Sequence, residues 1–406
     1  MGSDWPVAVI GGVFQTGLNL MRDLIRKGVR AVGVSHELEH EGFRSRYGKC
    51  YVCPNPDEQP VQWVDFMQGL SRDLQRDGGP KPVFICSADQ WVTALATHEQ
   101  ALRDYFTFSP GAQIQSALTN KDDQYALADQ YDFPRSLTAQ IHSTEDARAF
   151  AAQASFPCLL KPLTAREWDA LPEGNLLRGK KIVVSQTPEE LLAHYAETEP
   201  HRPNVVAQEL IQGPDKCKYC YFAVYGSDGG LLSNGVVQEY RTHPKFFGMA
   251  SVTRPVVEPE VLSVCDSFFQ AIGYVGICEI ELKRDTRDGK IKLIEVNPRF
   301  TGSGDAASYM GVETGWLHYL DLIGQKPEPA PASRFDFYHI CLKLDCMAFP
   351  GYLSDRDLTW RDVITPYRGK REYYDLDWND PRLAATTILK CARYLAGGLW
   401  RHLKSK

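Results

Sequence analysis

The stretch GICEIELKRDTRDGKIKLIEVNPRF, residues 276–300, has the pattern of a β-hairpin. Two apolar-rich runs, 277–283 and 290–296, are separated by the segment 285–289, Asp-Thr-Arg-Asp-Gly. Asp and Gly are residue types that favour turns, and runs rich in β-branched residues on either side of such a segment favour strands. The stretch therefore predicts two antiparallel strands joined by a short turn.

The polar side chains of this hairpin have the chemistry of a metal and phosphate site. Because side chains alternate across a strand, Glu279 and Glu281 are expected on one face of the first strand. In the second strand one face carries Glu295, Asn297 and Arg299. Carboxylate and amide oxygens suit Mg²⁺, which commonly bridges protein carboxylates to nucleotide phosphates, and an arginine beside them can stabilise transferring phosphoryl charge. A solvated strand face is the less favoured alternative, because Glu-x-Asn-Pro-Arg is an unusual end for an exposed strand.

The composition is that of an ordinary globular protein with two or three domains. The chain has 406 residues, of which 43% are hydrophobic and 24% charged. Its net charge of −6 argues against a nucleic-acid partner, because phosphate binding favours a basic surface. No apolar run has the length of a membrane span, and the N-terminus lacks a signal-peptide pattern.

The cysteines favour a reducing environment. Their number, 11, is odd and they are scattered, which argues against a disulfide framework and for a cytoplasmic protein. Two Cys-x-x-Cys pairs have the spacing of zinc ligands, but they fall in segments assigned to different domains. We expect buried thiols and no zinc at these pairs, which are Cys50 with Cys53 and Cys217 with Cys220.

The N-terminal residues 1–118 predict an α/β domain with a parallel sheet. The strand pattern at 6–12 is followed by a helical pattern and then by the strand pattern VRAVGVS at 29–35. The glycines Gly11, Gly12 and Gly17 do not have the Gly-x-Gly-x-x-Gly spacing, and no acidic residue ends the second strand. A nicotinamide-dependent oxidoreductase is therefore a weak alternative.

Two lysines occupy places that local structure disfavours. Lys121 follows Thr119 and Asn120, the candidate caps of a helix, so its charge opposes the helix dipole. Lys161 interrupts an apolar strand pattern at 155–163 and needs a partner there. A phosphate group would supply a favourable partner for each.

The chain ends in a helical pattern whose apolar residues fall on one side. These are Ile388, Ala392, Leu395, Leu399 and Leu403, and basic residues follow at Arg401, His402, Lys404 and Lys406. We expect the apolar side to pack on the body of the protein. Binding to a membrane surface is the less favoured alternative.

Taken together, these motifs resemble the ATP-grasp superfamily, and within it the carboxylate–amine ligases similar to D-aspartate ligase and the large subunit of carbamoyl phosphate synthetase. The resemblance covers about residues 5–325 and rests on motifs in the family's order. These are VAVIGG, TNKDD, CLLKPL, QELIQGPD and the hairpin at 276–300. It departs in the loop 162–181, which lacks a glycine-rich clamp and in which Lys180 or Lys181 is a substitute candidate. The region after about 330 matches no pattern with a known role.

The resemblance implies an ATP site. Phosphates would be contacted by Lys121 and Lys161, adenine by the backbone of Glu209, Leu210 and Ile211, and ribose by Asp215. Mg²⁺, with Mn²⁺ as the alternative, would be held by Glu281, Glu295 and Asn297, and Arg299 would hold the γ-phosphate and then an acyl phosphate. Strand register alone leaves open whether Glu279 or Glu281 binds the metal, and only the resemblance selects Glu281.

The function implied is an ATP-dependent carboxylate–amine ligase that forms an amide through an acyl phosphate and releases ADP and phosphate. A basic loop bearing Arg241, His243 and Arg254 is a candidate for gripping the substrate carboxylate, with solvated loop charges as an equal alternative. The partners expected are a small carboxylate and a small amine; a homodimer is left open. A non-catalytic nucleotide-binding or scaffolding protein is the rival class.

The implied fold class is α/β, with a Rossmann-like domain, a two-lobed ATP-grasp domain and a C-terminal extension. The expected bounds are 1–118 for the first domain, 119–325 for the second, with lobes 119–203 and 204–325, and 326–406 for the extension.

Overall fold

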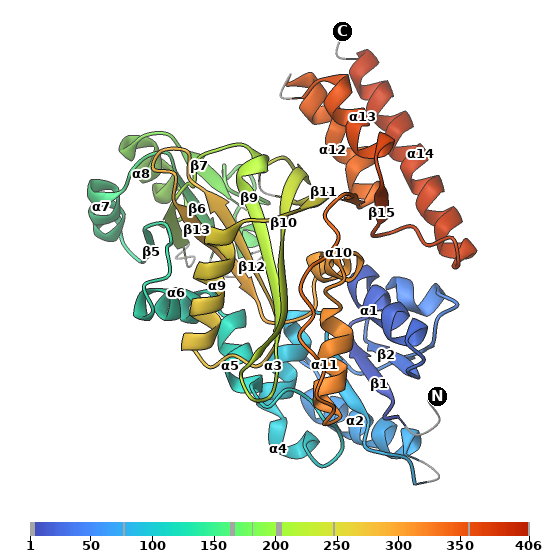
Figure 1. Ribbon diagram of the computed structural model, residues 1–406. Coiled ribbons are helices and arrows are strands. Elements are labelled where there is room, and N and C mark those ends of the chain that lie inside the picture. The colour runs from blue at the N-terminus through green and yellow to red at the C-terminus, as the bar shows by residue number, and fades with distance from the viewer. Residues whose placement is uncertain are drawn as a thin grey trace. The chain divides into compact units, whose positions relative to one another are not determined.

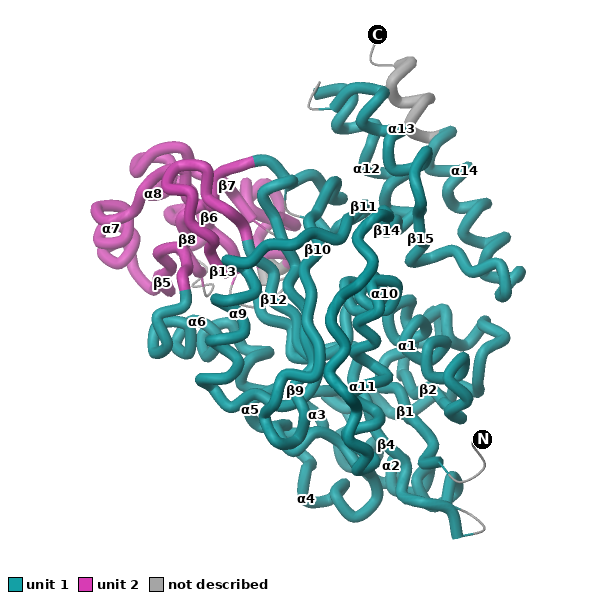
Figure 2. The backbone as a smooth tube through the Cα atoms, in the orientation of Figure 1, with its two compact units in different colours: residues 1–133, 214–282, 294–406 teal, residues 134–213, 283–293 magenta. Residues whose placement is uncertain are grey.

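The computed structural model describes residues 5–75, 78–162, 167–180, 182–199, 205–246, 248–355 and 358–404. The chain forms two compact units, coloured separately in Figure 2. Unit 1 comprises residues 1–133, 214–282 and 294–406, and unit 2 comprises residues 134–213 and 283–293. The predicted domain bounds remain predictions, because compact units and evolutionary domains need not coincide.

Unit 1 begins with a parallel sheet of four strands in the order β3-β2-β1-β4. Both faces of β1 and β2 are buried, as expected for continuous β-branched runs in a parallel sheet. The strands are β1 (Ala8–Gly11), β2 (Ala31–Ser35), β3 (Lys49–Val52) and β4 (Val83–Cys86), and the elements that follow them are α1 (Gln15–Arg26), η1 (Glu41–Arg44), α2 (Pro60–Leu74), α3 (Asp89–Thr97) and α4 (Glu99–Leu102). The predicted βαβ opening is confirmed.

The glycines of the first turn serve close packing. A Cβ on Gly17 would lie 1.9 Å from the backbone oxygen of Gly12, so α1 can begin at this distance from the turn only with glycine there. Gly12 itself has φ +84°, in the left-handed region. The packing of α1 against the first turn therefore explains these glycines, whose spacing differs from Gly-x-Gly-x-x-Gly.

The larger sheet of unit 1 has seven strands in the order β13-β12-β9-β10-β11-β14-β15. Its strands are β9 (Lys218–Tyr225), β10 (Leu231–His243), β11 (Met249–Val256), β12 (Gly276–Arg284), β13 (Ile291–Asn297), β14 (Tyr338–Ile340) and β15 (Arg371–Tyr373). The helices and the short 3-10 turn that accompany this part of the chain are α5 (Ala112–Thr119), α6 (Lys121–Gln130), η4 (Asp215–Cys217), α9 (Pro259–Ala271), α10 (Gly302–Met310) and α11 (Thr314–Leu322). The hairpin predicted at residues 276–300 is confirmed as β12 and β13.

The C-terminal region extends this same sheet. β14 pairs antiparallel with β11, and β15 pairs parallel with β14. The helices α12 (Leu342–Ser354), α13 (Trp360–Arg368) and α14 (Pro381–Lys404) complete it and lie together near the C-terminus in Figure 1. No described helix combines the length and the apolar character that a membrane crossing requires.

Part of the apolar side predicted for α14 faces away from the protein. Among the helix residues whose side chains the structure describes, 381–396, the buried ones are Leu383, Ala384, Thr387 and Cys391. Ile388, by contrast, is 43% exposed, and Ala392 is exposed as well. The prediction that this side packs on the body is therefore wrong for Ile388 and Ala392, while Leu395 is half-buried. The helix is rotated so that it buries a neighbouring stripe.

Unit 2 contains an antiparallel sheet of four strands in the order β5-β8-β6-β7. Its elements are β5 (Thr138–Ile141), α7 (Thr144–Gln153), β6 (Cys158–Pro162), η2 (Glu167–Ala170), β7 (Val183–Ser185), α8 (Pro188–Ala196) and β8 (Val205–Glu209). Thr187 caps α8, accepting from the backbone N–H of Glu190 at 3.3 Å. The Glu190 carboxylate accepts from Gln186, one residue earlier than a capping box requires.

A buried carboxylate organises the end of the hairpin in unit 2. The Asp285 side chain is 0% exposed, and it accepts from Arg287 Nη2 at 2.7 Å and from Lys292 Nζ at 2.8 Å. Burial alone would raise the pKa of Asp285, but the bonds from Arg287 and Lys292 hold that pKa below its ordinary value. The carboxylate is therefore charged in the folded protein and paired on both sides.

Replacing Asp285 with Asn is expected to lower the free energy of unfolding by about 3 kcal/mol at pH 7, because two partly buried cations lose their partner. A lowered carboxylate pKa stabilises the fold above the pKa of the unfolded chain, and this contribution is lost as pH falls. Urea unfolding should therefore show the difference from wild type shrinking between pH 7 and pH 3. Asp288→Asn, at a side chain 38% exposed, is the control and should cost below about 1 kcal/mol. A difference independent of pH would contradict this account.

Candidate functional site

A cavity of about 350 Å³ in unit 1 gathers the polar residues of the hairpin. Glu279 and Glu281 of β12 line it together with Glu295, Asn297 and Arg299, so the predicted common face is present. The rest of its wall comes from other segments of the chain, including Phe14, Thr16, Glu239, Met249, Ser251, His339 and Tyr374.

Glu279 connects the two strands of the hairpin to α10. Its Oε1 accepts from Asn297 Nδ2 at 3.0 Å, and its Oε2 accepts from Thr301 Oγ1 at 2.7 Å. Thr301 in turn caps α10. With both oxygens engaged and only 4% of the residue exposed, Glu279 acts as a positioning residue that orients Asn297.

Glu281 lies among other carboxylates. Burial raises the pKa of Glu281, and the negative charges of Glu239, Glu279 and Glu295 raise it further, while Lys218 opposes them. Such a concentration of like charge in a half-buried place is costly unless a cation neutralises it. The residues around Glu281 therefore fit a divalent cation better than they fit an empty polar face.

The donor set matches Mg²⁺ bound together with phosphate. Among the described residues, no three His, Cys, Asp or Glu side chains form a group that could hold a metal by themselves. Mg²⁺ in nucleotide enzymes, however, commonly takes one or two carboxylates and completes its shell with phosphate oxygens and water. Glu281 and Glu295 would supply two carboxylates, and the amide oxygen of Asn297 would be a third protein ligand.

Arg299 is held rigidly beside this cluster. Its Nε donates to Asp89 Oδ1 at 2.6 Å and its Nη2 to Asp89 Oδ2 at 3.0 Å, in a two-point ion pair. Nη2 also donates to Asn297 Oδ1 at 2.9 Å, which leaves that amide oxygen a second lone pair for a metal. Arg299 remains 18% exposed, so its guanidinium can still meet an anion in the cavity.

Two anchors of the site were not singled out as functional from the sequence. Asp89 stands at the start of α3, just after β4, and an acidic residue at the carboxyl end of a parallel strand is a signal that could have found it. Glu239 on β10 is 3% exposed, with its Oε2 3.3 Å from Lys218 Nζ. No sequence pattern around Glu239 marks it as a functional residue in a comparable way.

The structure places Lys121 near the hairpin. Asn120 caps α6, accepting from the N–H of Asp122 at 2.8 Å, so the predicted helix start is confirmed. Lys121 Nζ lies 3.8 Å from Glu295 Oε1, and both side chains are partly exposed. The phosphate contact of Lys121 stays a prediction.

The predicted phosphate contact Lys161 and the predicted adenine contacts Glu209, Leu210 and Ile211 belong to unit 2. Lys161 on β6 donates to Gln208 Oε1 at 3.0 Å. At the end of β8, the carboxylate of Glu209 accepts from Ser155 N–H at 2.7 Å, and Leu210 already uses both its N–H and its carbonyl. Ile211 is 7% exposed. Adenine contacts by these residues stay a prediction, as does the phosphate contact of the exposed Lys180; Lys181 lies outside the described residues.

The position of Asp215 contradicts its implied ribose contact. The residue is 3% exposed, and its Oδ2 accepts from the hydroxyls of Thr242 and Tyr352 and from the N–H of Phe246. Lys218 Nζ lies 4.0 Å from the other oxygen. The carboxylate therefore faces the interior of unit 1, where it joins β10 to α12.

Arg241 is an interior anchor and not a substrate-gripping residue. It is 0% exposed, and its Nε and Nη2 donate to the two oxygens of Asp345 on α12 at 2.7 and 2.8 Å. The loop predicted around it is in fact the end of β10, which runs to His243. The strand geometry turns Arg241 inward against α12, so the prediction of a catalytic role is wrong.

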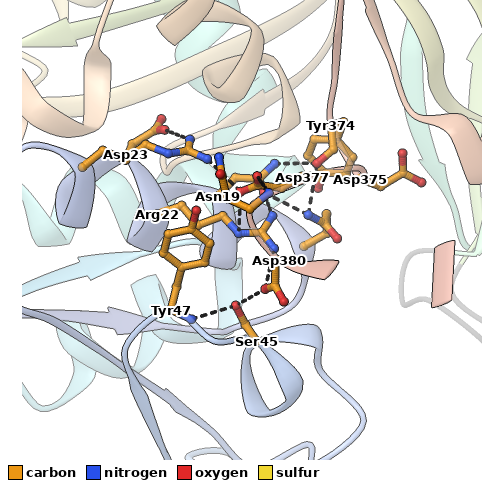
Figure 3. Close-up of polar contacts among 12 residues, drawn as sticks. Asn19, Arg22, Asp23, Ser45, Tyr47, Tyr374, Asp375, Asp377 and Asp380 are labelled. Atoms are coloured by element: carbon orange, nitrogen blue, oxygen red, sulfur yellow. Dashed lines mark hydrogen bonds and ion pairs between the residues drawn. The ribbon is translucent and has the colours of Figure 1, made fainter. Parts of the chain in front are cut away.

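The C-terminal region contributes to the cavity. Figure 3 shows Tyr374 beside α1, where its carbonyl accepts from Asn19 Nδ2 at 2.8 Å. The Tyr374 hydroxyl lies 2.6 Å from Thr16 Oγ1, and both residues line the cavity. Further ion pairs fasten the same segment to α1, with Arg22 Nη2 3.0 Å from Asp380 (Figure 3) and Arg26 Nη2 2.7 Å from Asp377. The region without a recognised pattern thus forms one wall of the site.

Replacing Arg241 with Ala is expected to lower the free energy of unfolding by about 4 kcal/mol, because Asp345 is left as a buried charge without its main partner. Calorimetry of the purified variant measures this loss. Arg254→Ala is the control, since Arg254 is an exposed side chain on β11 and its loss should change stability by less than about 0.5 kcal/mol. Unchanged stability in Arg241→Ala with a raised KM for the carboxylate would restore the original prediction.

Comparisons with known proteins agree on one fold. No family model matches the chain. D-aspartate ligase of Enterococcus faecium is 24% identical over 298 residues, which cover 70% of this chain and 69% of that protein. The ADP complex of purK, N5-carboxyaminoimidazole ribonucleotide synthetase, superposes with a TM-score of 0.64 at 14% identity, over 88% of this chain and 86% of that one.

An L-amino acid ligase from Bacillus licheniformis superposes with a TM-score of 0.55 at 16% identity, over 78% of this chain and 74% of that one. The biotin carboxylase subunit of pyruvate carboxylase gives the same TM-score and identity over 82% of this chain and 73% of that one. These proteins confirm the α/β architecture and the resemblance carried by the motifs: the chain has the ATP-grasp fold.

Proposed function

We propose that the protein is an ATP-dependent carboxylate–amine ligase that forms an amide through an acyl phosphate. The observation that carries this proposal is the cavity in which Glu281, Glu295, Asn297 and Arg299 stand together on an ATP-grasp fold. The similarity to D-aspartate ligase supports the same reaction class. ADP and phosphate are the expected co-products.

The metal of this site is proposed to be Mg²⁺, with Mn²⁺ as an alternative because it shares the preference for oxygen ligands. Glu281, Glu295 and Asn297 would hold it. When bound, it would neutralise phosphate charge and relieve the repulsion among the carboxylates around Glu281.

The nucleotide contacts are proposed on chemical grounds. Lys121 would meet phosphate from its place beside Glu295. Lys161 and the backbone of Glu209–Ile211 keep their proposed phosphate and adenine roles, supported by the motifs CLLKPL and QELI in the family's order. That the purK structure was solved with ADP supports a nucleotide site on this fold.

The reaction needs no protein nucleophile. An oxygen of the substrate carboxylate attacks the γ-phosphorus of ATP, and the bond from that phosphorus to the bridging oxygen breaks to release ADP. The amine then attacks the acyl carbon, loses a proton, and expels phosphate with the original carboxylate oxygen. Arg299, fixed by Asp89, is positioned to stabilise the charge on the phosphoryl group throughout.

The substrates are proposed to meet the part of the cavity wall that the hairpin does not form. The lining residues outside the hairpin include apolar and polar side chains from separate segments, which are Phe14, Thr16, Met249, Ser251, His339 and Tyr374. Arg254 and His243 keep their proposed role as basic contacts of the substrate carboxylate, although neither lines this cavity. The name of the curated relative makes D-aspartate the first compound to screen.

The setting proposed for this reaction is the cytoplasm, where the free cysteines, many of them buried, would stay reduced. The partners are small molecules. A homodimer and the domain bounds at 118, 203 and 325 are kept as proposals that light scattering and limited proteolysis can test.

A screen of ADP release over pairs of carboxylates and amines, with Mg²⁺ and ATP, tests the function. Once a pair is found, Glu281→Gln is expected to lower kcat at least about 100-fold, because a metal ligand is lost. Its thermal stability without Mg²⁺ should equal or exceed that of wild type, since a repelling charge is removed.

Glu279→Gln is the matched variant on the same strand. It places an amide donor against the donors Asn297 and Thr301, so it should lower the free energy of unfolding by about 1–3 kcal/mol. If Glu279→Gln kept full stability and lost Mg²⁺-dependent ATP binding, while Glu281→Gln remained active, the assignment of the metal ligand would be reversed. Full activity in both variants would contradict the proposal.

A further inference from the structure

We propose that the outward side of α14 docks on an anionic lipid surface, with the helix lying parallel to that surface. The proposal concerns a face of the protein separate from the ligase cavity, and it stands independently of the reaction.

The outward side of α14 is an apolar stripe. The helix packs through its buried residues on α12, while the residues at the spacing of the opposite side are all exposed: Ala385, Ile388, Leu389, Ala392 and Ala396. Leu389 is 62% exposed and Ile388 is 43% exposed. A stripe of this length at helical spacing is the pattern of a binding face, whereas single exposed apolar residues are ordinary.

The charges of the same segment have one sign. Residues 381–406 contain no Asp or Glu, and their charged residues are Arg382, Lys390, Arg393, Arg401, Lys404 and Lys406. Arg382 and Arg393 are exposed and fall beside Leu389 on the helix, at spacings of seven and four residues. The rest of the chain more than offsets this charge, because the whole protein has a net charge of −6.

A partner for this side must be apolar and anionic together. An anionic bilayer offers both over a wide area, and a basic amphipathic helix buries its apolar side at the boundary of headgroups and acyl chains. A second copy of α14 is disfavoured because it would bring arginines against arginines. A nucleic acid would satisfy the charges and leave Ile388 and Leu389 in water.

Trp378 adds a further feature of an interfacial segment. It is 70% exposed and lies just before the first turn of α14. Tryptophan favours the headgroup region of a bilayer, where an apolar ring and a polar N–H are both satisfied.

Flotation of the full-length protein with vesicles tests the proposal. Binding is expected to vesicles of phosphatidylglycerol and phosphatidylcholine, to fall with added salt, and to be at least ten-fold weaker for pure phosphatidylcholine. The double variant Ile388→Glu with Leu389→Glu should lose at least ten-fold in partitioning. Val61→Glu, a change at a 68% exposed position on α2, is the matched control and should bind as wild type does.

Replacement of one arginine tests the electrostatic contribution to vesicle binding. Arg393→Gln should weaken binding to the anionic vesicles about five-fold, in line with about 1 kcal/mol for each basic residue near such a surface. Circular dichroism and thermal unfolding verify that the variants remain folded. Unchanged flotation of the double variant, equal binding to neutral vesicles, or a dimer that the double variant dissociates without any vesicle binding would each overturn the proposal.

Discussion

The two carboxylate oxygens of Glu279 hold together the strands and the helix on which the candidate site is built. One oxygen fixes the amide of Asn297 across the hairpin, and the other fixes Thr301 at the start of α10. Because Glu279 is buried and fully bonded, the remaining hairpin carboxylates must be neutralised by something other than the hairpin itself. The ion pair of Arg299 with Asp89 neutralises one edge, and Lys218 partly neutralises Glu239. Glu281 and Glu295 face the cavity, and Lys121 Nζ lies 3.8 Å from Glu295. A metal–phosphate complex would complete this arrangement.

The C-terminal region matters because it closes this arrangement from the other side. β14 and β15 extend the seven-stranded sheet, and the chain then brings Tyr374 against Thr16 of α1. The buried pair of Arg241 with Asp345 fastens α12 to β10. The wall of the cavity is therefore made of segments that lie far apart in the sequence.

Local patterns were sufficient for the features that local chemistry decides. The hairpin turn, the common face of Glu281 and Glu295 and the cap of α6 at Asn120 all follow from alternation or from residue preferences over a few positions. The motifs in their order were sufficient for the ATP-grasp fold.

Long-range pairing explains what was missed. Arg241 looked like a loop cation because its partner, Asp345, lies in a helix far along the chain. Asp215 matched a motif, yet Thr242 and Tyr352 draw its carboxylate inward. For α14 the hydrophobic pattern identified an apolar side, but only packing decides which stripe is buried, and Leu383 and Cys391 were buried in place of Ile388.

The acyl phosphate is the central claim, and transfer of ¹⁸O tests it most directly. A carboxylate substrate labelled with ¹⁸O in both oxygens is turned over with ATP, Mg²⁺ and the amine, and the released phosphate is analysed by ³¹P nuclear magnetic resonance. The account predicts one ¹⁸O atom in each phosphate formed, because the carboxylate oxygen that attacks the γ-phosphorus departs with it. Phosphate without label, at a rate of ADP release equal to that of amide formation, would contradict it.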